Sequence, residues 1–172
     1  RKKLRKFIEN YKPIVISINI NKFVPKKYID FYAVFNDTRI LVDHKKYSKL
    51  DKPLIVPSYK LKKIGNKTRF NKILDYGAKI DNKNFIAKNK YCILPNNQSF
   101  GYALAISAAG RAKKTFIFGF DGFSKGHHSN YEMNLILKNF QKNYKKIPIC
   151  SISKTNYLVK KLNIQWKKRN LF

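Results

Sequence analysis

Short apolar runs separated by polar segments rich in asparagine and lysine are the dominant pattern along this chain. The spacing of Leu4, Phe7 and Ile8 predicts a helix that ends before Pro13. Bulky apolar runs of three to five residues predict buried strands, and spacings of three and four predict helices. Strands are expected at 14–18, 31–35, 54–56, 115–118 and 147–150, with shorter ones at 73–74, 85–86 and 91–94. Helices are expected near 24–30, 102–109, 131–144 and 158–162, with Ser99 as the N-cap of the second.

Strands that alternate with helices predict an α/β fold built on a doubly wound, mainly parallel sheet, as in Rossmann-like proteins. The length of 172 residues favours a single domain that covers the whole chain. A doubly wound nucleotide-binding fold usually opens with a strand and a glycine-rich turn, whereas the first element here is a helix. We therefore expect that the first strand lies upstream of residue 1 or is missing from this domain.

The net charge of +29 suggests an anionic ligand. Of the 38 basic residues, 32 are Lys and 6 are Arg, and they are spread over the whole chain. Because Arg is preferred for bidentate phosphate contacts, this composition favours a solvated surface over nucleic-acid binding, which stays as an alternative. The positive field would attract a nucleotide sugar or an acidic glycan. The 44% content of hydrophobic residues excludes a disordered chain.

Two cysteines, Cys92 and Cys150, lie far apart and within or beside apolar runs. They are predicted to be buried free thiols of a reduced compartment. No apolar run approaches the roughly 18 residues that span a bilayer, and no signal peptide is visible. We expect a cytoplasmic protein, with peripheral contact to anionic lipid at the inner face of the membrane as an open alternative.

Polar residues follow three of the predicted strands. Asn19 and Asn21 follow the first, Asn36 and Asp37 the second, and 119–121, with Gly119 and Asp121, follows the strand at 115–118. The carboxyl ends of parallel strands share one edge of a sheet, where ligands of open α/β sheets bind. Asparagine amides would suit a nucleobase edge or ribose hydroxyls, although asparagine and aspartate also favour turns after strands.

Two further features are candidates for chemistry. Ser99 and Gly101 open a helix of small residues, and its N-terminus would hold a phosphate; the alternative is a capping serine on a closely packed helix. His127 and His128 lie in the predicted loop after strand 115–118, where an imidazole could act as a general base or remain an inert surface group. No ligand spacing joins them to a cysteine or a third histidine, so a zinc site is not expected.

At these residues the chain resembles the bacterial sialyltransferases that use CMP-sialic acid, glycosyltransferase family 42. The segments that carry the resemblance are 14–21, 32–36, 99–121 and 128–150. The segment from Gly119 to Ser124, followed by Asn130 and Tyr131, is most similar to sialyltransferase-like domains that are appended to aldolase-type enzymes of surface-polysaccharide clusters.

The resemblance implies a Rossmann-like, GT-A-like glycosyltransferase that transfers a nonulosonic acid from a CMP-sugar without a metal or other cofactor. It places the CMP-contacting asparagines on Asn19 and Asn36, and the donor phosphate beside Ser99 and Gly101. It places the general base on His128. The expected acceptor is an acidic or lipid-linked glycan in the synthesis of surface polysaccharide or lipooligosaccharide.

The chain departs from the family at two places. Its opening glycine-rich turn is absent from this segment, and the lid before the histidine is reduced to 122–127. Without a lid, water would compete with the acceptor for the donor. A second hypothesis is therefore a non-catalytic accessory domain that is fused to, or works with, an aldolase.

Overall fold

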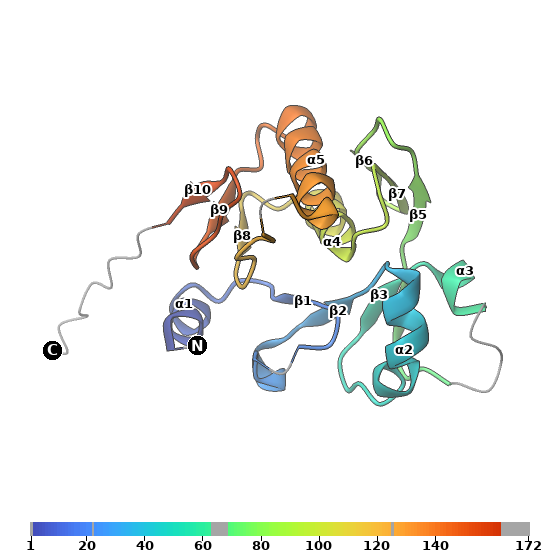
Figure 1. Ribbon diagram of the computed structural model, residues 1–172. Coiled ribbons are helices and arrows are strands. Elements are labelled where there is room, and N and C mark those ends of the chain that lie inside the picture. The colour runs from blue at the N-terminus through green and yellow to red at the C-terminus, as the bar shows by residue number, and fades with distance from the viewer. Residues whose placement is uncertain (1, 22, 63–68, 125, 163–172) are drawn as a thin grey trace, which may run out of the picture.

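The computed structural model describes residues 2–21, 23–62, 69–124 and 126–162, which form three small sheets around a central helix (Figure 1). Sheet A is fully parallel and contains β1 (Ile16–Ile18), β2 (Phe31–Ala33), β3 (Leu54–Val56) and β4 (Ile73–Asp75) in that order. Sheet C is also parallel, with the order β10 (Lys160–Lys161), β9 (Ile149–Ser151) and β8 (Thr115–Ile117). Sheet B has the order β5 (Gly77–Ile80), β7 (Tyr91–Leu94) and β6 (Ile86–Ala87), and its β6–β7 pair is antiparallel.

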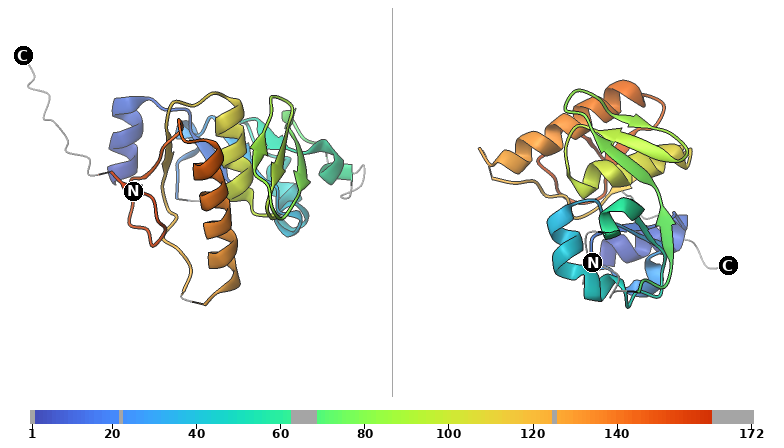
Figure 2. Two further views of the ribbon diagram at one scale, coloured as in Figure 1. Left: turned by 90° about the horizontal axis from the view of Figure 1, so that it is seen from above. Right: turned by 90° about the vertical axis from the view of Figure 1, so that its right-hand side faces the viewer.

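Helices connect most of the parallel strands. They are α1 (Lys2–Tyr11), the 3-10 helix η1 (Lys26–Tyr28), α2 (Asp37–Tyr47), α3 (Ser58–Leu61), α4 (Ser99–Ala109) and α5 (His128–Asn143). Helix α4 contacts β1 and β2 of sheet A and β6 and β7 of sheet B. On the side of sheet C, the Ser107 and Thr115 hydroxyl oxygens are 3.1 Å apart. Figures 1 and 2 accordingly show α4 between sheets B and C, with α5 beside it.

The central strands β2 and β3 of sheet A are buried on both faces, as strands of parallel sheets usually are, whereas the edge strand β4 is largely exposed. Along β2 and the residues that follow it, Ala33 and Phe35 belong to the core around α4, while Tyr32 and Val34 belong to a second core beneath α2. The same alternation sends Ile55 of β3 to the α4 side. Both faces of this strand therefore pack against a helix, α4 on one side and α2 on the other. This is why its sequence shows no alternation of polar and apolar residues.

The structure confirms the predicted α/β class with mostly parallel sheets and helices between strands, together with two buried free cysteines. The described strands form three sheets instead of the expected single one, because β5, β6 and β7 pair only with one another. The helix expected at 158–162 is wrong: residues 160–161 form β10, whose ladder to β9 supplies hydrogen bonds that one helical turn would lack. Residues beyond 162 lie outside the described part.

Helix α2 was not predicted from the sequence. Ile40, Asp43 and Tyr47 form its buried face, but the exposed apolar residues Leu41 and Val42 hide that spacing. Within the described part of the chain, no helix is long and apolar enough to cross a membrane.

The two cores contain phenol and thiol groups that are held in their neutral forms. Burial raises the pKa of the Cys92 thiol to about 12, and burial is also the main cause that raises the pKa values of Tyr47, Tyr76 and Tyr102. Tyr102 donates its hydroxyl hydrogen to the carbonyl oxygen of Tyr76 at 2.5 Å, a bond that ionisation would remove.

We expect the protein to lose stability as the pH rises above about 9. From about pH 9 for the thiol and about pH 10 for the phenols, the unfolded chain releases protons that the native core retains. The unfolded state then binds fewer protons than the native state, so the free energy of unfolding falls with rising pH. Urea unfolding between pH 7 and 11 measures this effect. A midpoint that stays constant above pH 9 would contradict the burial of these groups.

Candidate functional site

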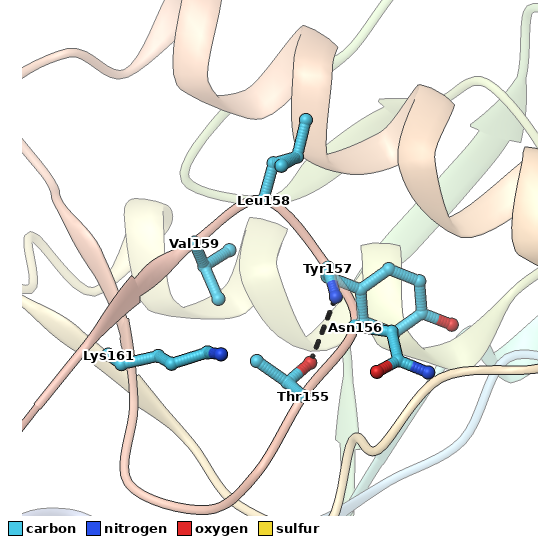
Figure 3. Close-up of a pocket in the computed structure, with 6 residues that line it drawn as sticks. All are labelled: Thr155, Asn156, Tyr157, Leu158, Val159 and Lys161. Atoms are coloured by element: carbon cyan, nitrogen blue, oxygen red, sulfur yellow. Dashed lines mark hydrogen bonds between the residues drawn. The ribbon is translucent and has the colours of Figure 1, made fainter.

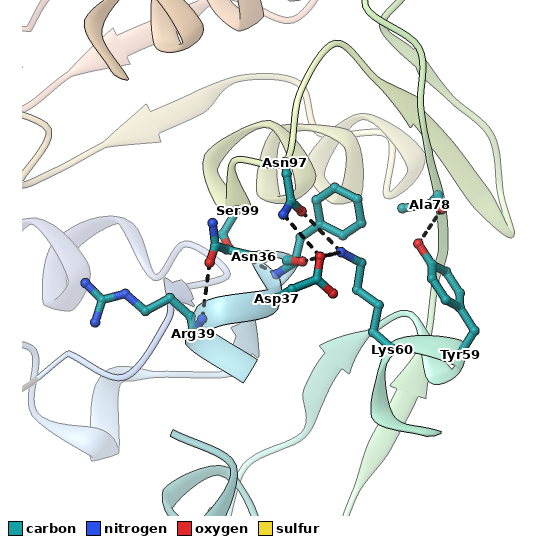
Figure 4. A network of polar contacts seen from close by, with 9 residues as sticks. Asn36, Asp37, Arg39, Tyr59, Lys60, Ala78, Asn97 and Ser99 are labelled. Atoms are coloured by element: carbon teal, nitrogen blue, oxygen red, sulfur yellow. Dashed lines mark hydrogen bonds and ion pairs between the residues drawn. The ribbon is translucent and has the colours of Figure 1, made fainter. Parts of the chain in front are cut away.

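The carboxyl end of β2 is tied directly to the start of α4. The Ser99 hydroxyl oxygen accepts hydrogen bonds from the backbone N–H groups of Phe35 (3.0 Å) and Asn36 (3.2 Å) (Figure 4). The end of β8 reaches the same place, because the Phe120 ring packs on Phe100 with ring centroids 4.6 Å apart. The strand ends predicted to share one edge therefore meet around the first turn of α4, although they belong to two sheets.

The two predicted cytidine-contacting asparagines lie at this edge in different states. Asn19 follows β1 with a left-handed backbone (φ 56°), which asparagine tolerates better than most residues, and its N–H donates to Ala33 O. Its side-chain oxygen is buried without a hydrogen-bond partner among the described residues. Asn36 is the N-cap of α2, and its side-chain oxygen accepts from Arg39 N at 3.1 Å. The Asn36 oxygen is thus occupied, and its NH₂ group is the part that is left for a ligand.

A buried lysine, Lys60, lies next to the end of β2 and the start of α2. The Lys60 side chain is 4% exposed, and its ammonium group donates to Phe35 O (2.8 Å), Asp37 Oδ2 (2.9 Å) and Asn97 Oδ1 (3.1 Å) (Figure 4). The ammonium also lies 3.9 Å from the centroid of the Phe35 ring. Because three acceptors surround it, this cation holds β2, α2 and the β7–α4 loop together.

The β7–α4 loop continues the polar contacts to α5. Asn96 donates to the backbone oxygen of Glu132 (3.0 Å), and Gln98 donates to its carboxylate (2.6 Å). The same carboxylate oxygen lies 3.7 Å from Nδ1 of His128, in the first turn of α5. Glu132 is 22% exposed and His128 is 80% exposed. An imidazole that is open to solvent and has a carboxylate nearby can accept a proton from a bound hydroxyl group.

The two adjacent histidines have different environments. His127 is the N-cap of α5, and its Nδ1 accepts from Ser129 N at 3.1 Å. Its ring stacks on Phe123, with centroids 4.8 Å apart and an angle of 13°. His127 therefore begins the helix and packs on the preceding loop, whereas His128 faces Glu132. The sequence put both histidines in one loop and only the family resemblance selected His128, whereas the structure shows that their surroundings differ.

The residues after β8 form an open turn. Gly119 (φ 76°) donates its N–H to Ser153 Oγ at 3.0 Å, and Asp121 is exposed. The backbone oxygen of Asp121 accepts from Asn156 N (2.9 Å). Its carboxylate makes no hydrogen bond or ion pair with another described residue. A side chain at Gly122 (φ 106°) would come within 3.0 Å of the Asn156 side chain, so the glycine permits this close approach.

A hollow of about 670 Å³ lies next to this turn, inside the crossover from β9 to β10. Hydroxyl, amide and ammonium groups share its wall with two aliphatic side chains (Figure 3). The lining residues are Thr155, Asn156, Tyr157, Leu158, Val159 and Lys161. Such a mixed surface suits a polar ligand that also has an apolar face.

The start of α4 differs from its prediction. Gln98, not Ser99, is the N-cap, because the Ser99 hydroxyl is turned to the end of β2 and its residue is 4% exposed. Gly101 packs on α5, and a Cβ there would lie 3.3 Å from the Ile136 side chain. Both residues therefore have a structural role, and a phosphate at this helix start would meet backbone N–H groups.

Sequence reasoning missed Lys60, Asn97, Gln98 and Glu132. A helix that included His128 would have placed Glu132 four residues further on the same face, but the predicted helix began at Tyr131. Lys60 has no local signal, because its partners are 23 to 37 residues away in sequence.

Among the described residues, no group of three His, Cys, Asp or Glu side chains is placed to hold a metal ion. Comparisons with protein-family models, with curated proteins and with solved structures found no match to this chain. Its function must therefore be argued from the geometry of the site.

Proposed function

We propose that the protein is a glycosyltransferase-like domain that binds a CMP-activated nonulosonic acid and transfers it to a glycan acceptor. One observation carries the proposal: the chain of contacts Gln98–Glu132–His128 lies beside the first turn of α4, where the ends of β2 and β8 meet. This arrangement puts an imidazole with a neighbouring carboxylate beside the edge at which parallel α/β sheets bind nucleotides.

In this proposal the nucleotide lies over the ends of β1 and β2. The Asn36 NH₂ group would donate to an acceptor atom of the base, since its oxygen already caps α2. Asn19 would lie beside the ribose or the base, with the start of α4 facing the phosphate. Asp121 and the hollow at Asn156 are placed to contact hydroxyl groups of the sugars.

The transfer step requires one proton acceptor. The acceptor hydroxyl would lose its proton to Nε2 of His128, while the Glu132 carboxylate, 3.7 Å from Nδ1, would stabilise the positive charge that the ring gains. The acceptor oxygen then forms its bond to the anomeric carbon. The bond from that carbon to the phosphate oxygen breaks, and CMP leaves with the bonding electrons. The charges balance without any group beyond the donor, the acceptor and the imidazole.

A thermal-shift measurement with CMP tests the donor site. At a concentration 100-fold above its dissociation constant, a ligand adds about 2.7 kcal/mol to the free energy of unfolding. For a domain of this size we expect CMP to raise Tm by roughly 5–11 °C. AMP at equal ionic strength is the control, because a chain with a net charge of +29 attracts any anion. A chelator should change nothing. Equal shifts with CMP and AMP would refute a cytidine site.

A second candidate is a non-catalytic accessory domain that binds a sugar nucleotide. His128 is 80% exposed, and Gly122, Phe123 and Ser124 of the adjacent loop are exposed, so water has free access to the site. Such exposure favours binding without efficient transfer. CMP stabilisation without measurable transfer or donor hydrolysis would select this candidate.

A further inference from the structure

A second pocket lies on the α2 side of sheet A and begins at Ile20, directly after Asn19. Its volume is about 490 Å³, and it is formed by the segment after β1, by η1 and by the end of α2. Its floor is apolar: Tyr32 and Leu50 are buried, and Ile20 and Val24 pack on the same core. Its lining residues are Ile20, Asn21, Val24, Pro25, Lys26, Tyr32, Lys46, Lys49 and Leu50.

Three lysines from separate segments line this pocket. Lys26 belongs to η1, Lys46 to the last turn of α2, and Lys49 to the turn that follows. Asp43 forms an ion pair with Lys46 at 2.5 Å. Lys26 and Lys49 have no ion pair with another described residue, so the pocket keeps an excess of positive charge above an apolar floor.

Two exposed apolar side chains lie near these lysines in the sequence. Phe23 is 62% exposed and lies between the lining residues Asn21 and Val24. Its backbone N–H donates to the side-chain oxygen of Asn21 (2.7 Å), which fixes the turn that presents it. On α2, Val42 is 67% exposed and lies one turn before Lys46. Figure 1 shows η1 and the last turn of α2 on the same side of the molecule, at the bottom of the view.

We propose that this face docks on a membrane that contains anionic phospholipid, with the pocket receiving a phosphate-bearing head group. The lysines complement the phosphate, and the apolar floor covers the glycerol end of the lipid. Phe23 would enter the interfacial layer, which aromatic side chains favour. A free phosphate ion would make no use of the apolar floor or of Phe23, whereas a lipid would contact both. We therefore favour a lipid head group over a free phosphate. The proposal is independent of the reaction proposed above.

Co-sedimentation with vesicles tests this surface. We expect binding to phosphatidylcholine vesicles with about 30 mol% phosphatidylglycerol, and little binding to phosphatidylcholine alone, at about 0.15 M salt. The pair Lys26→Gln and Lys49→Gln should weaken binding roughly 10- to 30-fold, since each lysine near an anionic surface contributes about 1 kcal/mol. The matched pair Lys138→Gln and Lys142→Gln, on the exposed surface of α5, should weaken it less than about 3-fold.

Phe23→Ala supplies an independent measurement, because it changes no charge. It should weaken binding several-fold at every salt concentration, whereas the loss from the lysine pair should shrink at high salt. If both lysine pairs weakened vesicle binding equally, the binding would come from the overall positive charge and not from this pocket, which would overturn the proposal. An absence of vesicle binding would also overturn it. So would inorganic phosphate or an unrelated oligonucleotide that displaces the unmodified protein and the α5 variant from vesicles at the same concentration.

Discussion

Lys60→Met should lower the free energy of unfolding by about 3 kcal/mol, near the lower end of the range for breaking a buried ion pair. The substitution leaves the buried Phe35 carbonyl and the Asn97 side chain without their shared donor. Asp37 is 38% exposed and can turn to water, which limits the loss. For a domain of this size the change in Tm is roughly −6 to −12 °C, and calorimetry or urea unfolding measures it.

Lys45→Met is the matched control, because Lys45 is exposed on α2. It should change the free energy of unfolding by less than about 0.5 kcal/mol. A Lys60→Met protein as stable as the Lys45→Met protein would show that the ammonium does not join β2, α2 and the β7–α4 loop.

His128→Ala should lower the turnover of sugar transfer by roughly 10²–10⁴-fold, because it removes the proposed general base. CMP binding should stay nearly unchanged, since in the proposed mechanism the imidazole would contact the acceptor and not the nucleotide. Glu132→Gln should lower turnover less, by roughly 10-fold, because the ring keeps its place but loses its charged partner. Steady-state transfer from a CMP-nonulosonic acid, with CMP release as the readout, measures these effects.

His127→Ala separates a catalytic from a capping histidine. Loss of the N-cap of α5 should lower the free energy of unfolding by about 1 kcal/mol, and turnover should fall less than about 3-fold. Small and equal effects on turnover at both histidines, in a preparation that transfers sugar, would mean that neither imidazole accepts the proton.

Local patterns were sufficient for most of the secondary structure. The strand at 54–56 was predicted with its observed bounds, and those at 31–35 and 115–118 were one or two residues too long. The β5 strand, Gly77–Ile80, was missed, because it has few apolar residues and its stability comes from pairing with β7. The same cause explains β10, where a ladder to β9 replaced the expected helix.

The candidate site was predicted in part. The sequence indicated that polar strand ends would share one edge of a single sheet, whereas the structure brings the ends of β2 and β8 together from two sheets, at the start of α4. Composition alone could not distinguish His127 from His128, although the resemblance placed the general base on His128; their different surroundings depend on where α5 begins and on Glu132. The sequence also assigned Ser99 to a phosphate and a helix cap, whereas the hydroxyl accepts two N–H groups from the end of β2.

The sequence by itself determined the α/β class and the burial of both cysteines, and it put polar residues at the ends of apolar strands. These follow from apolar runs and from polar residues at their ends, which act over a few neighbouring positions. Only the tertiary structure decided which polar groups are occupied and which are open, as at Asn36, Lys60 and His128. The physical reason is that hydrogen bonds of buried groups are satisfied by residues distant in sequence, and no local pattern specifies those partners.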